Sequence, residues 1–245
     1  MEKRKRNRKR WIWILSILLL MLAIASALYI SDYYHASEEA MNELAHPSDA
    51  IEIIQEDDRI ILEPPKARAG MIFYPGGKVA YEAYVPLMEL CAERGILCVI
   101  PQMPGNLAVL DQNAADGILE RFPQIKSWYL AGHSLGGTVA AIYLADHADE
   151  YDGLILLASY STSDLSNTNL KVLSIYGSED GVLNRKAYDE NRSMLPAATR
   201  EVCISGGCHA YFGTYGEQSG DGTPTITPQE QQQTTANEIA QFIFP

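Results

Sequence analysis

The chain has 245 residues, of which 47 % are hydrophobic, and this size suits one folded domain with a sizeable core plus a short appendage. Its net charge is −12, and because the first ten residues contribute +6, the remainder carries −18. Such an acidic remainder argues against nucleic acid as a partner and against a second, electrostatic contact with anionic lipid.

The first thirty residues are typical of a membrane anchor. Residues 2–10 carry seven Lys or Arg and one Glu, and residues 11–30 contain no charge, Gly or Pro. A helix of twenty residues rises about 30 Å, which matches the hydrocarbon core of a bilayer. We therefore expect a basic cytoplasmic flank (1–10) and a retained single-pass signal-anchor (11–30) in the cell membrane, with an extracytoplasmic domain beyond it. The alternative is a cleavable signal peptide, because residues 23–27 (AIASA) contain two A-x-A patterns.

Residues 31–49 are polar and charged, with a helical pattern over residues 36–44, and we interpret them as a stalk. The folded domain is expected to span residues 50–245. It begins with two β-rich runs, 50–55 and 59–62, that flank Glu-Asp-Asp and predict a hairpin.

Apolar strand segments then alternate with helical segments to the end of the chain. The expected strands are 70–74, 96–100, 127–131, 153–159, 170–176 and 199–205, and the expected helices are 80–94, 107–122, 135–144, 183–195 and 228–244. This alternation predicts a doubly wound, mostly parallel sheet with helices on both faces. The longest irregular segment, 213–227, is expected to be a surface loop near the functional site.

One serine lies at a predicted strand-to-helix turn. Residues 132–136 read Gly-His-Ser-Leu-Gly, so that Ser134 is flanked two positions away by glycines that let the strand and the helix approach closely. The turn exposes the serine Oγ, and the N-terminus of the following helix favours a negative charge beside it. The pattern predicts a nucleophile; the alternative is a glycine-rich turn whose serine only caps the helix.

A nucleophilic serine needs a base, and the base needs a partner that fixes its tautomer. His209 follows the last predicted strand, on a loop from which it can reach Ser134, whereas His133 is carried on the tight turn itself. Asp180 lies on the loop after the penultimate strand and is the preferred acid. Glu179 and Asp164 remain alternatives.

Two N–H groups are needed for the negative oxygen of a tetrahedral intermediate. The first is expected from Leu135, directly after the serine. The second is expected from the loop that starts at Pro75, which has no N–H, so that Gly77 is preferred and Gly76 or Lys78 are alternatives.

The four cysteines are an even number in a compartment that permits disulfides. Sequence proximity favours the pairs Cys91–Cys98 and Cys203–Cys208; other pairings, or buried free thiols, remain open. The spacing of Cys and His shows no metal-binding pattern, and a serine triad needs neither a metal nor another cofactor, so none is expected.

Several motifs together resemble the α/β-hydrolase superfamily, and within it a branch of small, often membrane-anchored bacterial hydrolases similar to dienelactone hydrolases. The motifs are YPGGKV, MPGNLAVL, GHSLGG, ASYSTSDLS, SIYGSEDGV and GGCHAYFGTYGEQSGDGT. The resemblance implies an α/β-hydrolase fold, a triad of Ser134, Asp180 and His209, and an oxyanion hole from Gly77 and Leu135. The short loop before the acid-bearing strand implies little or no cap domain.

We therefore expect a serine hydrolase that cleaves carboxylic esters, either small molecules or material of the cell envelope. A thioesterase, amidase or acyltransferase would use the same five residues. A binding protein that keeps the fold without catalysis is the alternative from another class.

Overall fold

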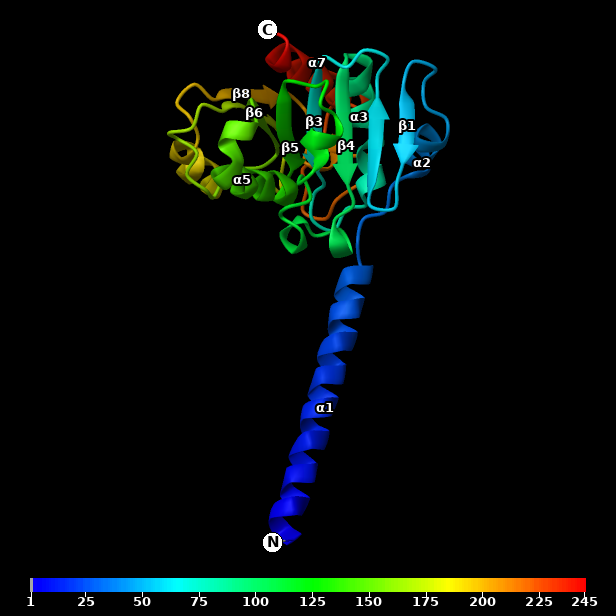
Figure 1. The fold of residues 1–245 in the computed structure, drawn as a ribbon, viewed down its shortest axis with the longest axis vertical. Helices are drawn as coiled ribbons and strands as arrows, with labels where there is room; N and C mark the ends of the chain where they lie inside the picture. The colour runs from blue at the N-terminus through cyan, green and yellow to red at the C-terminus, as the bar shows by residue number, and fades with distance from the viewer. Residues whose placement is uncertain (1) are drawn as a thin grey trace. The chain divides into compact units, whose positions relative to one another are not determined.

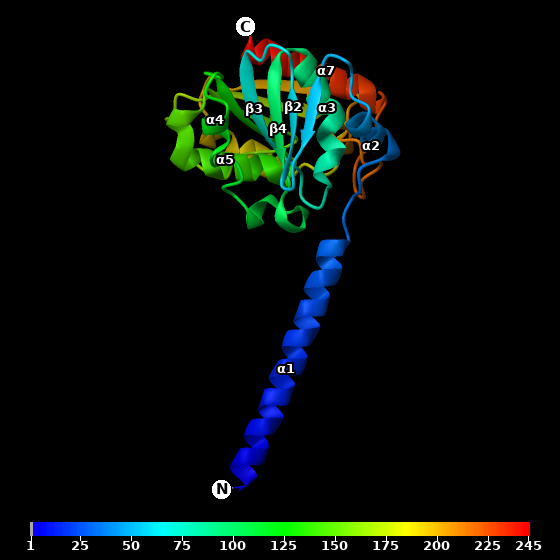
Figure 2. The ribbon, with the colours of Figure 1, turned by 45° about the vertical axis from the view of Figure 1, so that its right-hand side comes forward.

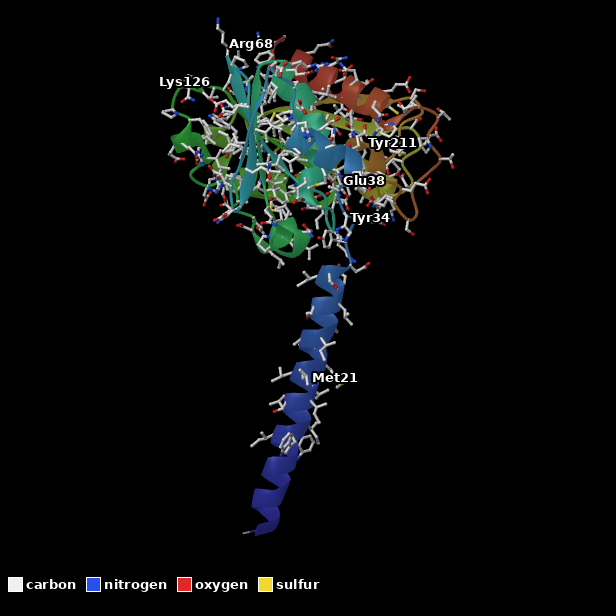
Figure 3. The ribbon with its side chains drawn as sticks, turned by 90° about the vertical axis from the view of Figure 1, so that its right-hand side faces the viewer. Met21, Tyr34, Glu38, Arg68, Lys126 and Tyr211 are labelled. Atoms are coloured by element: carbon white, nitrogen blue, oxygen red, sulfur yellow. The ribbon has the colours of Figure 1, made fainter. Side chains whose placement is uncertain are left out.

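The computed structural model describes residues 2–245, with side chains from residue 11 onward, and the chain divides into two units, Met1–Tyr33 and Tyr34–Pro245. The first unit is one helix, α1 (Glu2–Ser31). Its segment Trp11–Ser31 has a mean hydropathy of 2.5 and is long and apolar enough to cross a membrane. Apolar side chains, Met21 among them, project from all sides of this helix and are exposed (Figure 3). A helix that is apolar all round and unburied is a candidate transmembrane helix.

The second unit is built on one eight-stranded sheet in the order β1-β2-β4-β3-β5-β6-β7-β8 (Figure 1). The strands are β1 (Glu52–Gln55), β2 (Arg59–Glu63), β3 (Ala69–Tyr74), β4 (Ile96–Pro101), β5 (Trp128–His133), β6 (Gly153–Leu157), β7 (Lys171–Gly177) and β8 (Arg200–Ile204). The first two strands form the predicted hairpin, β2 pairs antiparallel with β4, and all other pairs are parallel. The predicted doubly wound, mostly parallel sheet is confirmed.

Helices cover both faces of the sheet because alternate residues of each strand point to opposite sides. The helices of this unit are α2 (Glu38–Ala45), α3 (Val85–Glu93), α4 (Ile118–Arg121), α5 (Leu135–His147), α6 (Arg185–Glu190) and α7 (Pro228–Ile243). Helices α3 and α7 close one core cluster, and α5 closes the other (Figure 2). In β5, for example, Ala131 packs into the first cluster and Leu130 into the second.

The segment interpreted as a stalk differs from that expectation. From Tyr34 onward it belongs to the folded unit, which also includes Glu38 (Figure 3). Ser37 caps α2 by accepting a hydrogen bond from the Ala40 N–H, and Ala40 and Leu44 are buried. The amphipathic pattern of α2 therefore serves packing against the domain.

The helix expected over residues 107–122 is not continuous. The structure has a short 3₁₀ turn, η3 (Ala108–Leu110), and the single helical turn α4. Gly117 has a φ of 74°, which ends regular helix before α4 begins. The Tyr74 hydroxyl accepts from the Ala115 N–H and donates to the Gln112 carbonyl, so that a side chain from the sheet takes the place of helical hydrogen bonds.

Neither expected disulfide is formed, because all four cysteines are free thiols. Cys91 and Cys98 are buried in the core, and burial together with the neighbouring Cys91 thiol raises the pKa of Cys98 well above its usual value. Cys203 is exposed on β8, whereas Cys208 is buried on the loop that follows it.

The connection between β6 and β7 has no room for a cap. Residues 158–170 contain no helix and no strand. The ends of the strands that carry the predicted site are therefore not covered by an inserted helical domain at this point of the chain.

Candidate functional site

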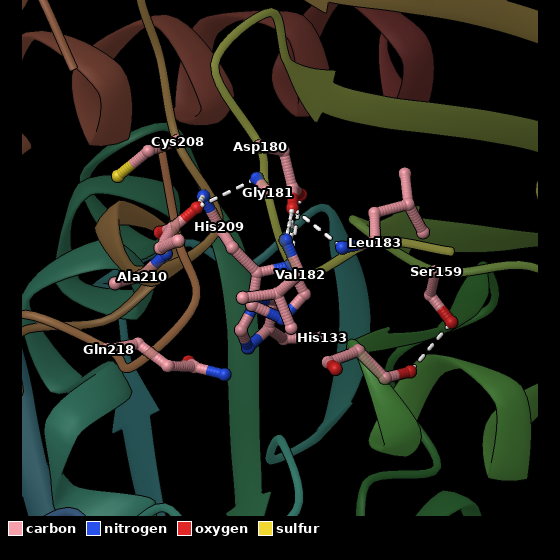
Figure 4. Close-up of polar contacts among 12 residues, drawn as sticks. His133, Ser159, Asp180, Gly181, Val182, Leu183, Cys208, His209, Ala210 and Gln218 are labelled. Carbon is pink, nitrogen blue, oxygen red and sulfur yellow. Dashed lines mark hydrogen bonds and ion pairs between the residues drawn. The ribbon is translucent and has the colours of Figure 1, made fainter. Parts of the chain in front are cut away.

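Ser134 occupies a strained turn between β5 and α5. Its φ of 51° and ψ of −123° lie in a region that residues other than glycine rarely adopt. The Ser134 N–H donates to the Leu157 carbonyl (2.9 Å), and the Ser134 carbonyl accepts from Ser159 Oγ (2.7 Å) as well as from N–H groups in the first turn of α5. Figure 4 shows the Ser159 side chain pointing towards this turn. The predicted strand–turn–helix is confirmed, and the serine is half-exposed.

The glycines beside Ser134 are needed for close packing. A Cβ on Gly136 would lie 2.2 Å from the Tyr74 carbonyl oxygen and 2.3 Å from that of Pro75, and a Cβ on Gly132 would lie 2.5 Å from the Gly137 nitrogen. These distances are far below van der Waals contact. The turn therefore places the start of α5 directly against the loop that follows β3.

His209 and Asp180 are brought together. His209 Nδ1 lies 2.9 Å from Asp180 Oδ2 and 3.1 Å from Oδ1, and each side chain is only 1 % exposed. The Val182 and Leu183 N–H groups also donate to Asp180 Oδ1, at 2.9 and 2.7 Å (Figure 4). An acceptor-only carboxylate at Nδ1 places the proton of the neutral ring there and leaves Nε2 as a lone-pair acceptor.

The alternative acids lie elsewhere. Glu179 accepts from its neighbour Ser178 Oγ at 2.8 Å, and Asp164 is exposed and accepts from the Ser166 N–H. Asp180 is thus the candidate that contacts the predicted base.

The predicted bond between the serine and the base is not formed in this structure. His209 Nε2 is buried and has no hydrogen-bond partner among the described residues. The His133 ring, next to Ser134 in the chain, packs 4.5 Å from the His209 ring between centroids. Bonds of this kind are often long in unliganded sites and shorten when substrate binds. The roles of Ser134 and His209 stay predictions.

The two predicted oxyanion donors are neighbours. A Cβ on Gly77 would lie 2.9 Å from Leu135 Cδ2. The other candidate N–H groups are occupied, because Gly76 donates to the Tyr84 hydroxyl (3.0 Å) and Lys78 donates to the Asn106 carbonyl (2.7 Å). Among the described residues, the Gly77 and Leu135 N–H groups have no such acceptor.

Sequence reasoning missed Tyr84. Its buried hydroxyl accepts from the Gly76 N–H and lies 2.8 Å from His133 Nδ1. Burial, and next the neighbouring His209, lower the pKa of His133 well below 6.5, so the imidazole is neutral at neutral pH. The Tyr84 O–H can then donate to Nδ1. Tyr84 thereby connects the loop after β3 to the end of β5. Because Tyr84 and His133 are 49 positions apart, no local sequence pattern predicts this contact.

Sequence reasoning also missed Asp221, in the irregular segment 213–227. Its Oδ1 accepts from the N–H groups of Gly181 (3.1 Å), His209 (3.1 Å) and Gly222 (2.9 Å), and its Oδ2 accepts from Ala210 N–H (2.8 Å). Burial acts to raise the pKa of Asp221, but the hydrogen bonds from the Ala210, Gly181 and His209 N–H groups and from the neighbouring Cys208 side chain outweigh it and hold the pKa below its usual value. The carboxylate therefore fastens the backbone beside Asp180 to the backbone of His209.

A signal for Asp221 is present in the sequence, since it stands between two glycines in the longest irregular segment, shortly after the predicted base. Its target could not be read from that position. No group of three or more His, Cys, Asp or Glu side chains in the described part of the chain is arranged to hold a metal ion.

Comparison with known proteins identifies the family of the chain. The sequence matches the alpha/beta hydrolase family over residues 70–234, which is more than half of the chain. A search of curated proteins found no match. The narrower resemblance to dienelactone hydrolases stays a prediction.

Similar solved structures share the fold at low sequence identity. MGS-MChE2, an alpha/beta hydrolase enzyme from the metagenome of lagoon sediments of Mar Chica, Morocco, has a TM-score of 0.57 and 15 % identity, over 78 % of this chain and 98 % of its own. Est1E from Butyrivibrio proteoclasticus has a TM-score of 0.57 and 14 % identity, over 80 % of this chain and 100 % of its own. A bacterial membrane phospholipase A has a TM-score of 0.58 and 13 % identity, over 94 % of this chain and 97 % of its own.

The buried neutral imidazole of His133 predicts a pH dependence of stability. The unfolded chain takes up a proton at this histidine below about pH 6.5, whereas the folded chain does not, so the free energy of unfolding falls as the pH drops through that value. Between pH 7.5 and 5.5 the loss due to this group is about 1 kcal/mol. Urea unfolding at both pH values should show that His133→Gln removes this part of the loss. His147→Gln is the matched control, and an equal effect of both substitutions would contradict the assignment.

Proposed function

Because the chain belongs to the alpha/beta hydrolase family, we propose that it is a serine hydrolase that cleaves carboxylic esters through an acyl-enzyme. The observation that carries the proposal is the buried His209–Asp180 pair, whose free Nε2 belongs to a ring packed beside the strained turn at Ser134. A histidine held in this tautomer is suited to accept a proton from a serine. The adjacent Gly77 and Leu135 N–H groups support the same chemistry, because they can donate to a developing oxyanion.

In this mechanism Ser134 Oγ attacks the ester carbonyl carbon while His209 Nε2 takes the hydroxyl proton. The negative oxygen of the tetrahedral intermediate accepts hydrogen bonds from the Gly77 and Leu135 N–H groups. Asp180 stabilises the imidazolium, which then gives its proton to the leaving alcohol as the C–O bond breaks. Water attacks the acyl-enzyme, gives a proton to His209, and the carboxylic acid leaves as Ser134 regains its hydrogen.

We also propose that α1 is a single-pass anchor with its basic end in the cytoplasm, which places the catalytic unit outside the cell membrane. The support is the apolar, exposed span Trp11–Ser31 and the seven basic residues that precede it. An N-terminal sequence of the mature protein that begins within residues 24–28 would contradict retention of the anchor.

Ser134→Ala tests the proposed nucleophile. We expect the turnover of p-nitrophenyl butyrate to fall by more than about 10⁴-fold, because the acyl-enzyme cannot form. Labelling by a fluorophosphonate probe should be lost as well. Ser205→Ala, an exposed serine after β8, is the control and should keep both. Labelling of the Ser134→Ala protein at the wild-type level would contradict the assignment of Ser134 as the nucleophile.

His209→Ala tests the proposed base. Its removal should lower ester turnover by about 10⁴-fold, because the group proposed to accept the serine proton is lost. His147 bonds to the Tyr143 carbonyl and stacks on the Tyr143 ring at the far end of α5, so His147→Ala should stay within about twofold of wild type. Equal losses in the two variants would refute the assignment.

Asp221→Asn tests the positioning of His209. The amide keeps the size of the side chain but replaces one acceptor oxygen with a donor that faces backbone N–H groups. We expect kcat to fall by about 10²-fold through misplacement of the base, with KM nearly unchanged. Glu217→Gln, an exposed carboxylate on the same loop, is the control. A loss confined to thermal stability, with kcat retained, would make Asp221 purely structural.

A further inference from the structure

The segment that follows α1 is hydrogen-bonded to the loop that carries Gly77. The Tyr34 N–H donates to the Lys78 carbonyl (2.7 Å), and the Ala80 N–H donates to the Tyr34 carbonyl (2.9 Å). These two bonds pair Tyr34 with Val79 in an isolated parallel β-bridge. Lys78 directly follows Gly77 in the chain. The folded unit therefore begins at its proposed oxyanion loop.

The same segment is bonded to the loop that follows His209. The Ser37 N–H donates to the Thr214 carbonyl (2.9 Å), and the Ser219 N–H donates to the Tyr34 hydroxyl (3.2 Å). The rings of Tyr34 and Tyr215 pack 5.5 Å apart between centroids. We call Tyr34–Ser37 the strap, because it holds the loop of the proposed oxyanion donor and the loop of the proposed base.

An exposed apolar turn, Val109–Leu110, follows shortly after a residue that is hydrogen-bonded to the oxyanion loop. Val109 is 44 % exposed and Leu110 is 56 % exposed, and among the large apolar side chains of residues 34–245 only Met41 is exposed to a similar degree. The turn follows Asn106, whose carbonyl accepts from the Lys78 N–H at 2.7 Å. The backbone of Lys78 thus bonds to the strap through its carbonyl and to the Asn106 loop through its N–H.

The covalent chain limits how far the strap can be from a membrane. Only Asp32 and Tyr33 lie between Ser31, the end of the apolar helix, and Tyr34, and the three Cα–Cα steps from Ser31 to Tyr34 span at most about 10 Å. This limit holds for every direction that the helix can take. If α1 crosses a bilayer, the loops bonded to the strap stay at the bilayer surface, where exposed apolar side chains are favourable.

We propose that this catalytic edge, made of the strap, the oxyanion loop and the Val109–Leu110 turn, rests on the lipid surface, and that the substrate is an acyl ester resident in the membrane. The inference rests on the proposed function and keeps its chemistry: water and the lipid ester give a fatty acid and an alcohol. The net charge of −18 beyond residue 10 offers no attraction to anionic lipid, so the tether and the apolar turn hold the edge in place.

The test uses the full-length protein in phosphatidylcholine vesicles. It compares p-nitrophenyl oleate, dissolved in the same vesicles as the protein or in separate vesicles, with p-nitrophenyl butyrate in the water; both probes release the same alcohol. We expect faster turnover of the oleate ester in the protein's own vesicles than in separate ones. Insertion of a flexible segment between Ser31 and Asp32 that lengthens the tether to about 24 residues should lower the oleate-to-butyrate rate ratio by about 20-fold.

Variants of the turn separate lipid contact from chemistry. The double substitution V109D/L110D should lower the oleate-to-butyrate ratio by about tenfold, because two apolar contacts with lipid are lost. Met41→Asp is the matched control, an exposed apolar residue of similar exposure on α2, and should leave the ratio unchanged. A ratio that resists both the longer tether and the double substitution, with butyrate still hydrolysed, would overturn the membrane-substrate inference alone. Hydrolysis of both esters no faster than by Ser134→Ala would overturn the proposed function itself.

Discussion

The positive φ at Ser134 is the constraint on which the rest of the site depends. A residue other than glycine in such a conformation costs about 1–3 kcal/mol, and bonds to Leu157 and Ser159 offset this cost. The sharp turn is possible only because Gly136 meets the loop after β3 without a Cβ. The same close approach puts Gly77 beside Leu135, so one steric requirement sets both the exposure of the serine and the place of the two free N–H groups.

Two carboxylates, Asp180 and the half-buried Asp221, organise the opposite side of the site through backbone N–H groups. Asp180 accepts from two N–H groups of its own loop and from His209, and Asp221 accepts from N–H groups beside Asp180 and at His209. A buried anion is tolerated when such donors surround it. The loop after β7 and the loop after β8 therefore cannot adopt their conformations independently, and this coupling fixes the position of Asp180 relative to His209.

The oxyanion loop is held in a similar way from two sides. The Tyr84 hydroxyl binds Gly76, and the backbone of Lys78 binds both Asn106 and Tyr34. The N–H of Gly77, which lies between Gly76 and Lys78, has no acceptor among the described residues. The hydrogen bonds of Gly76 and Lys78 thus fix the conformation of the loop, while the Gly77 N–H remains able to donate to a ligand.

Local pattern in the sequence was enough to predict the alternation of strands and helices, the hairpin and the turn at Ser134, because periodicity and glycine spacing are properties of adjacent residues. Loop position made Asp180 the preferred partner of His209 but left Glu179 and Asp164 open. Local pattern placed residues 31–49 in a stalk, because they are polar and charged, and residues 107–122 in a helix. Only the tertiary structure decided that the first packs on the domain and that Tyr74 and Gly117 break the second. Tyr84 and Asp221 also emerged there, because their hydrogen bonds join residues as many as 49 positions apart.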